Sequence, residues 1–260
     1  MRSFVRIFIY LKFGAVLVFL LFVKQISAQP APEKVPYYPG EEMNYLLHMG
    51  FLSLGRANIA FKTDSLNCDS YLHVDAGSTG FAKFIKNIHY EFGSCIDPST
   101  GRPFFATSAV REGNYYLETE YRFDHFSRPD SSIVYSEAFD SLAVKKNIFD
   151  LISAFYYFRS NYASENMTNI KSVTFTTFCE DITWDLTIRY AGKETIKTMF
   201  GPKECLIFMP VTEVGVYFRT TDDMTIWVTN DQKKIPVKMH VDLKVGSITA
   251  DLFNYHSPVF

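Results

Sequence analysis

Short segments with alternating apolar and polar side chains run through most of this chain. Between Tyr115 and Phe123 the odd positions are mostly aromatic or aliphatic, whereas Glu118, Glu120 and Arg122 occupy even positions. A period of two places the two sets on opposite faces of a β-strand, one dry and one wet. Similar segments recur roughly every 8 to 12 residues, at 43–49, 54–62, 71–75, 88–96, 104–111, 133–138, 173–178, 183–190, 195–200, 204–209, 217–221, 225–229, 237–245 and 247–253.

More than a dozen short strands exceed what one flat sheet usually carries. We therefore expect a mainly β protein, in which a single large antiparallel sheet curls into a barrel-like form or a sandwich. Turn signals fit between several segments, including Ala191-Gly192-Lys193 and Val245-Gly246-Ser247. No break in composition divides the chain, so we expect one β-rich domain over residues 41–257.

One segment has helical spacing instead. Asp150 is a suitable helix cap, and apolar residues follow at intervals of three and four, which predicts an amphipathic helix. Its apolar stripe comprises Leu151, Ile152, Phe155, Tyr156, Phe158 and Tyr162. Such a helix can pack against the curled sheet as a plug, or it can act as a lid over the sheet's mouth. The spacing leaves both roles open.

The first 28 residues are typical of a secretory signal peptide. Basic residues precede an apolar run of 11 residues, Phe13–Val23, and Ala28 before Gln29 offers a small residue at the expected cleavage site. An uncleaved anchor is the alternative, but the run is shorter than the ~20 residues of a spanning helix. We expect a mature chain without a spanning helix, exported to the periplasm or associated with an outer membrane. A proline-rich linker over 29–40 follows the signal.

Charge and aromatic content reduce the number of function classes that fit the chain. Of the 26 Lys and Arg residues, four lie in the predicted signal, which leaves 22 against 28 Asp and Glu and a mature net charge of about −6. Nucleic-acid binding needs a basic face, so we expect no nucleic-acid partner. The chain also has 25 Phe and 16 Tyr residues. Aromatic side chains in such number either fill a core or line a cavity.

The four cysteines are candidates for disulfide bonds, because an oxidising compartment allows thiols to pair. Cys68 opens the run around Tyr71–Asp75 and Cys95 closes the run 88–96, so an antiparallel pairing of these runs would place the two cysteines opposite each other. Cys179 and Cys205 would then pair by elimination. Free buried thiols stay open for this second pair, and no C-x-x-C spacing indicates a metal.

No catalytic motif stands out in the chain. A G-x-S-x-G elbow, an S-x-x-K pair, an H-E-x-x-H helix and a phosphate-binding glycine loop are all missing from the sequence. The six histidines are scattered, and His73 with His89 is the one pair that a hairpin could bring together. Two acid pairs lie near tryptophans, Glu180-Asp181 and Asp222-Asp223. Acids beside a Trp occur in sugar-processing sites, but adjacent acids in a turn are usually solvated. We expect no enzyme, no metal and no cofactor.

Four pieces of the sequence, read in order, resemble the uncharacterised bacterial family DUF3108. They are Pro39-Gly40-Glu41 with Tyr45 and 50–57; 149–159; 190–196 with Gly201 and Cys205; and 226–231 with 234–237 and 245–248. The resemblance implies an exported, mostly antiparallel β domain with one helix and no established activity. It carries over no catalytic or binding residues. A looser architectural likeness is to periplasmic lipoprotein carriers, whose curled sheet with a helical plug holds acyl chains.

Two functions are compatible with these features. The first is a binding module whose inward aromatic faces hold a hydrophobic or amphipathic envelope molecule, such as a lipid or a lipoprotein tail. The second is a structural or assembly partner that docks another envelope protein through strand edges or a surface patch.

Overall fold

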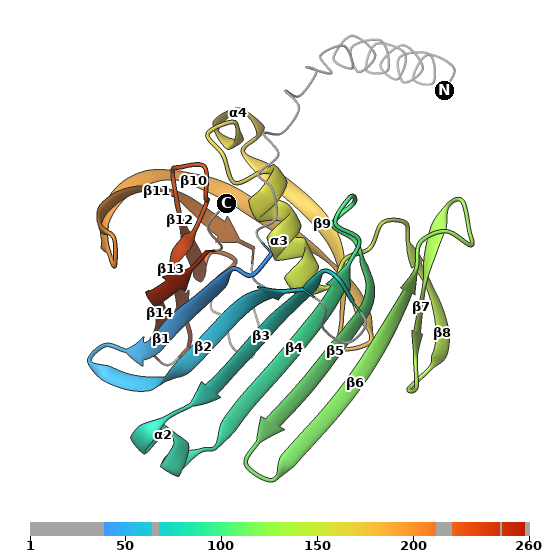
Figure 1. Ribbon diagram of the computed structural model, residues 1–260, viewed down its shortest axis with the longest axis horizontal. Helices are drawn as coiled ribbons and strands as arrows, with labels where there is room; N and C mark the ends of the chain where they lie inside the picture. Colours follow the sequence, from blue (N-terminus) through green and yellow to red (C-terminus); the bar gives the residue numbers. More distant parts are fainter. Residues whose placement is uncertain (1–38, 64–67, 212–219, 245, 258–260) are drawn as a thin grey trace, which may run out of the picture. The chain divides into compact units, whose positions relative to one another are not determined.

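The computed structural model describes residues 39–63, 68–211, 220–244 and 246–257. The expected signal peptide, with its cleavage site at Ala28 and Gln29, and most of the expected linker lie outside these residues. In the described part, 14 strands form one antiparallel sheet, with β1 beside β14 at its middle (Figure 1). The strands are β1 (Glu42–Met49), β2 (Leu52–Lys62), β3 (Tyr71–Ser78), β4 (Ile88–Ile96), β5 (Pro103–Glu112), β6 (Tyr115–Asp124), β7 (Ser131–Ser136), β8 (Asp140–Lys145), β9 (Ser172–Cys179), β10 (Ile182–Thr198), β11 (Gly201–Pro210), β12 (Met224–Thr229), β13 (Pro236–Asp242) and β14 (Ser247–His256).

The sheet consists of two meanders. Strands β1 to β8 are neighbours in chain order, and so are β9 to β14, so the outermost strands are β8 and β9. The pairing of β1 with β14, which sets Glu42 opposite His256, joins the two meanders. The expectation of one large curled antiparallel sheet is therefore confirmed.

The two outer strands approach each other across a seam. Phe149, just after β8, donates its N–H to the carbonyl of Thr176 on β9 over 3.0 Å, and the N–H of Phe178 donates back to the carbonyl of Phe149 over 2.7 Å. Lys145 of β8 also contacts Asp185 of β10, with Nζ and Oδ2 3.0 Å apart. These links make the sheet a nearly closed, barrel-like structure.

Helix α3 (Leu151–Asn161) lies inside the curve of the sheet (Figure 1). Asp150 caps it as predicted: its carboxylate accepts from the N–H groups of Ile152 and Ser153, and Ser153 reciprocates in a capping box. Tyr156 packs in one hydrophobic cluster with residues of β1 to β4, β11, β13 and β14. Phe158 packs in a second cluster with residues of β9 to β12. The helix thus contacts two opposite walls.

The prediction of a turn at Ala191-Gly192-Lys193 is wrong. Strand β10 continues through this point for 17 residues, and its pairing with β11 shifts register between Tyr190 and Gly192. Gly192 has a φ of 121°, which a glycine adopts without strain and which suits a β-bulge. The glycine therefore bends one strand instead of separating two.

Several further elements were not expected from the pattern. Strand β8 and two short helices, α2 (Gly80–Ile85) and α4 (Met167–Ile170), belong to this group. The segment expected at 217–221 lies mostly outside the described residues. Within the described part, no helix is long and apolar enough to cross a membrane.

Candidate binding site

The inner face of the sheet is defined by the side chains that contact α3. At one end of β1 to β4 these side chains are fully buried; Tyr45 and Phe61 are examples. The ring of Phe61 meets the ring of Tyr156 edge to face, with centroids 6.3 Å apart. At this end the helix and the sheet fill the interior with aromatic and aliphatic side chains, so an ordinary protein core occupies it.

The same face continues along β1 to β5 with mostly apolar side chains that are only half-buried. The cross-strand pairs Val74↔Phe92, Ala76↔Tyr90 and Tyr90↔Val110 place successive apolar residues side by side on it. We call this surface the inner wall and define it by Leu47, Ala57, Val74, Ala76, Tyr90, Phe92 and Val110, all of which are partly exposed. Apolar side chains that face the interior and keep contact with solvent are the lining expected of a binding site for an apolar molecule.

A buried ion pair links α3 to the residue before β1. Arg159 of α3 forms a bidentate pair with Glu41 just before β1, over 2.5 and 2.7 Å. Arg159 also donates to the carbonyls of Lys233 and Lys234, and Tyr255 donates its hydroxyl to Glu41 over 2.8 Å. Burial by itself lowers the pKa of Arg159, but the Glu41 carboxylate outweighs it and raises that pKa above its ordinary value. The guanidinium therefore stays charged.

Tyr156 carries a buried polar atom beside this ion pair. Its hydroxyl has no hydrogen-bond partner among the described residues, and the guanidinium of Arg159 lies over its ring, 5.8 Å from the centroid. Burial, followed by the charge of Glu41, raises the pKa of Tyr156 far above its ordinary value. The side chain is therefore neutral, and its unpaired hydroxyl makes the folded state less stable than a paired one would.

We expect Tyr156→Phe to leave the free energy of unfolding unchanged or to raise it by about 1 kcal/mol, because the substitution removes an unpaired buried hydroxyl. Urea unfolding followed by fluorescence measures this change. Tyr45→Phe is the matched control: the Tyr45 hydroxyl donates to the carbonyl of Pro236 over 2.7 Å, and its loss should cost about 1 kcal/mol. Equal destabilisation by both variants would contradict the assignment.

The predicted amphipathic helix is present, but its apolar residues do not form one stripe. Tyr156 and Phe158 are fully buried, against different walls, while Phe155 and Tyr162 are half-buried and Leu151 is 38% exposed. The single stripe was a prediction for a helix on one face of a sheet. A helix inside a curled sheet is covered from both sides, so its buried residues spread around it.

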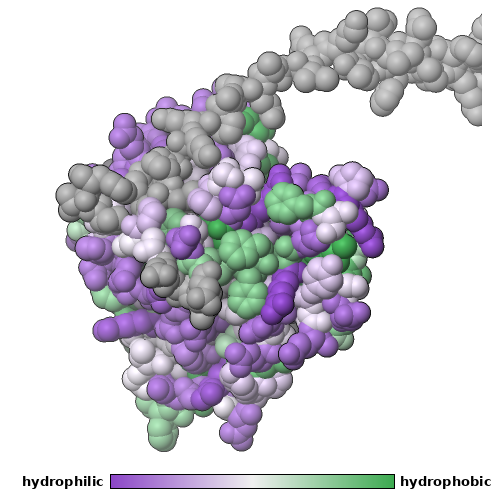
Figure 2. Space-filling model, turned by 45° about the vertical axis from the view of Figure 1, so that its right-hand side comes forward, coloured by the Kyte–Doolittle hydropathy of each residue, from purple (hydrophilic) through white to green (hydrophobic). Residues whose placement is uncertain are grey.

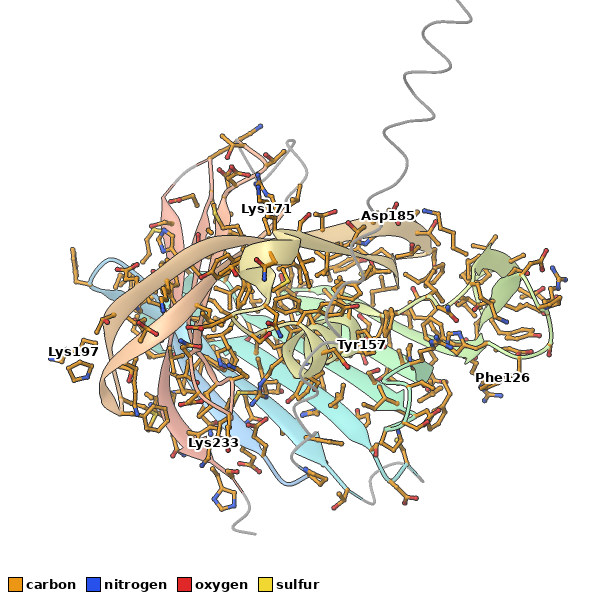
Figure 3. All side chains as sticks on the ribbon, turned by 90° about the horizontal axis from the view of Figure 1, so that it is seen from above. Phe126, Tyr157, Lys171, Asp185, Lys197 and Lys233 are labelled. Atoms are coloured by element: carbon orange, nitrogen blue, oxygen red, sulfur yellow. The ribbon has the colours of Figure 1, made fainter. Side chains whose placement is uncertain are left out.

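The residue after Tyr156 in α3 contacts the opposite side of the interior, at β9. Tyr157, labelled in Figure 3, packs against Phe149 with the two rings tilted and their centroids 4.9 Å apart, and its ring meets that of Phe175 of β9 at 5.9 Å. Phe149 belongs to the segment that crosses the seam. The aromatic side chains of α3 therefore also hold the seam segment in place.

The predicted cysteine pairs are not bonded in this structure, which has all four cysteines as free thiols. Cys68 and Cys95 do lie in one small buried cluster with Tyr71, but the predicted register is wrong, because the residue directly opposite Cys95 is Tyr71. Burial, together with a hydrogen bond to Cys68, raises the pKa of Cys95. A bond between these two stays a prediction. Cys205 is in the cluster around Tyr156, and Cys179 ends β9.

The acid pairs and the histidines are held in separate polar contacts. Asp222 forms an ion pair with Arg189, and Asp181 accepts a hydrogen bond from Tyr121 over 2.9 Å. His73 and His89 contact different acids, Glu91 and Asp75. No three His, Cys, Asp or Glu side chains in the described ranges are grouped to hold a metal ion.

Sequence patterns missed the partnership of Glu41 and Arg159, although both residues were visible. Arg159 is a charged residue inside an apolar helix segment, and Glu41 follows a Pro-Gly pair. A charge in such a position needs a partner if it is buried. What the pattern could not supply was which of the 28 acidic residues would be the partner.

Comparisons with known proteins identify a family and a fold. The family model described as "Protein of unknown function (DUF3108)" matches residues 44–252. No curated protein matches the chain. Among solved structures, the fold is similar to a "Beta-barrel-like Protein of Domain of Unknown Function DUF1849 from Brucella abortus", with a TM-score of 0.56 and 10% identity over 86% of this chain and 100% of that chain. At this identity the likeness concerns the fold alone.

Proposed function

We propose that this chain, which belongs to the DUF3108 family of proteins of unknown function, is an exported binding module that holds a long apolar chain, such as a lipid acyl chain, against its inner wall. The observation that carries this proposal is the partial exposure of the inner wall. Its residues are on the same face as the buried core, yet each of them stays partly exposed. Binding of this kind needs no catalytic group, metal or cofactor.

The chemistry of the inner wall favours an apolar ligand over a polar one. Six of its seven residues are aliphatic or Phe, and the seventh is Tyr90. Tyr90 directs its hydroxyl to the carboxylate of Glu112 at the strand end, so the ring contributes an apolar surface and keeps its polar tip outside. A hydrocarbon chain that covered this surface would gain about 25 cal/mol of binding free energy for each Å² of apolar surface removed from water.

Native mass spectrometry of gently purified protein tests the proposal directly. We expect a chain that begins at Gln29, as export with signal cleavage requires, and an additional mass that unfolding releases and that extracts into organic solvent. A chain that retains residues 1–28 would contradict the proposed export. Absence of any bound mass, together with no binding of a fluorescent C16 fatty acid, would overturn the binding function and leave the envelope-partner role as the better one.

A bulky residue on the inner wall should block the ligand. Ala76→Trp places an indole on the inner wall, and we expect it to weaken binding of a fluorescent C16 fatty acid at least tenfold, because the ligand loses contact area. Ala109→Trp is the matched control: Ala109 is half-buried like Ala76, but it alternates with the inner-wall residue Val110 and so lies on the outer face of β5. Its affinity should stay within twofold. Equal affinity for both variants would place the ligand elsewhere.

A further inference from the structure

Three connections lie together at one end of the sheet. They are the turn between β1 and β2, the segment with α2 between β3 and β4, and the turn between β5 and β6. Because neighbouring strands are antiparallel, alternate connections share an end, and the pairs Gly55↔Ser78 and Ile88↔Glu112 show this directly. Backbone hydrogen bonds join them, from Thr79 to Leu54 over 3.0 Å and from Gly113 to Asn87 over 2.7 Å. Figure 1 shows the three side by side at its lower edge.

These connections expose large apolar side chains. Phe51 is 103% exposed and Phe84 88%, and Phe81 and Ile85 are also more than two-thirds exposed. None of the six residues of α2 is buried. We call these four residues the apolar rim. In Figure 2, apolar surface projects at the lower end of the molecule, where Figure 1 places α2. Several large exposed apolar side chains gathered at one end of a sheet indicate an interaction site.

The three connections, together with the strand ends beside them, carry more basic than acidic residues, in contrast to the rest of the chain. In the ranges 49–56, 79–87 and 111–117 the charged residues are Arg56, Lys83, Lys86, Arg111 and Glu112. Glu112 pairs with Lys86, so the balance here is four basic residues against one acidic residue. The chain after residue 28 has 22 Lys and Arg against 28 Asp and Glu. A basic and aromatic end on an acidic domain complements a surface that is both anionic and apolar.

The apolar rim also continues into the inner wall. Leu47 precedes the turn that carries Phe51, and Ala76 precedes the segment that carries Phe81 and Phe84. Val110 leads to the third connection in the same way. An acyl chain that entered or left the inner wall at this end would pass the rim.

We propose that this end of the sheet docks on an anionic lipid bilayer, with Phe51, Phe81 and Phe84 inserted among the headgroups and Lys83 against lipid phosphates. The proposal rests on the proposed function, because docking would bring the inner wall to the source of its ligand. The apolar side chains protrude from separate connections and have basic residues beside them. A lipid headgroup layer can take up each of them individually, whereas a protein partner would need a surface complementary in shape to all of them.

Vesicle sedimentation tests the docking. Residues Pro32–Phe260 form a compact unit by themselves, so the chain is used from Gln29 on, without the apolar leader that would itself insert into bilayers. We expect binding to vesicles of 70% phosphatidylcholine and 30% phosphatidylglycerol, and at least fivefold weaker binding to phosphatidylcholine alone. Lys83→Gln should weaken binding to the anionic vesicles about fivefold.

The double variant Phe81→Ser with Phe84→Ser should lower the affinity for anionic vesicles at least tenfold, because two exposed aromatic side chains can no longer insert. Phe126→Ser is the matched control. Phe126 is 86% exposed but lies between β6 and β7, at the other end of β6 (Figure 3), and its loss should leave vesicle binding unchanged. Both positions are at the surface, so circular dichroism should show folded protein for every variant.

Each contrary outcome has a defined meaning. Equal vesicle binding by the wild type and the double rim variant overturns the proposal, and so does equal binding to both vesicle types. A dimer in analytical ultracentrifugation that the rim substitutions abolish, without vesicle binding, overturns it in favour of a second copy of the chain. The proposed function fails separately: rim variants should keep their affinity for the C16 fatty acid, while Ala76→Trp should lose that affinity and still bind vesicles.

Discussion

Replacing Arg159 with methionine should destabilise the fold by about 3 to 5 kcal/mol, the usual cost of breaking a buried ion pair. The carboxylate of Glu41, which is fully buried, would lose both guanidinium hydrogen bonds and, among the described residues, keep only that of Tyr255. The carbonyls of Lys233 and Lys234 would lose the donor that ties them to α3. Urea unfolding of the wild type and the variant measures the difference, and the urea dependence should show whether unfolding stays two-state.

Two further variants distinguish the effect of an unpaired buried charge from the effect of losing any ion pair. Glu41→Met with Arg159→Met should be more stable than Arg159→Met alone, because no unpaired charge is left in the interior. Lys193→Met provides the surface control. Lys193 contacts Glu165 and Glu204 in solvent, and its removal should cost far less than removal of Arg159. Similar costs for Lys193 and Arg159 would show that burial does not strengthen the ion pair.

Asp150→Ala should have the second large effect, a loss of about 2 to 4 kcal/mol. The Asp150 carboxylate is buried and accepts four hydrogen bonds: from the N–H groups of Ile152 and Ser153 over 2.8 and 2.9 Å, and from the hydroxyls of Ser94 and Ser153 over 2.6 and 2.9 Å. Alanine would take this acceptor away from the N–H groups of Ile152 and Ser153 and from the Ser94 hydroxyl, and it would remove the hydrogen bond that links the start of α3 to β4. Urea unfolding at pH 7 measures the loss.

The pH dependence of this site has a defined sign. Burial raises the pKa of Asp150, although the hydroxyl of Ser94 opposes the shift. A carboxyl with a raised pKa in the folded state contributes stability at low pH that is lost as the pH rises through the folded pKa. The stability of the wild type relative to Asp150→Asn, which cannot ionise, should therefore be greater at pH 4 than at pH 7. A relative stability that increases toward pH 7 would contradict the raised pKa.

The sheet and its helix were predictable because their signals are local. Alternation within one strand reveals its two faces, and Asp150 with apolar residues three and four apart predicts the helix, whatever the remaining chain does. The bulge at Gly192 was not predictable in this way, because a glycine with positive φ serves equally in a turn and in a bulge. Only the partner strand β11 decides between them, by continuing opposite β10 on both sides of the glycine.

The candidate binding site was predictable only as a general property. Abundant aromatic residues indicated either a filled core or a lined interior, and the structure shows a packed end around Tyr156 and the half-buried inner wall. Which apolar residues α3 would cover depends on where Arg159 meets Glu41, and these residues are 118 positions apart. The cysteine register failed for a similar reason, because Cys68 lies outside β3 and a one-strand pattern cannot show how the preceding segment folds back.

Because of the seam, the two edge strands of the sheet differ in how many backbone groups are free to pair with another molecule. The chain's own Phe149 occupies backbone groups of Thr176 and Phe178 on the outer margin of β9, while β8 is a short, mostly exposed strand that ends at Lys145. Growth of a fibre by strand addition requires two vacant margins on every copy. A copy recruited through β8 could therefore meet only the β8 of its neighbour, and association would stop at a closed two-fold pair instead of extending indefinitely.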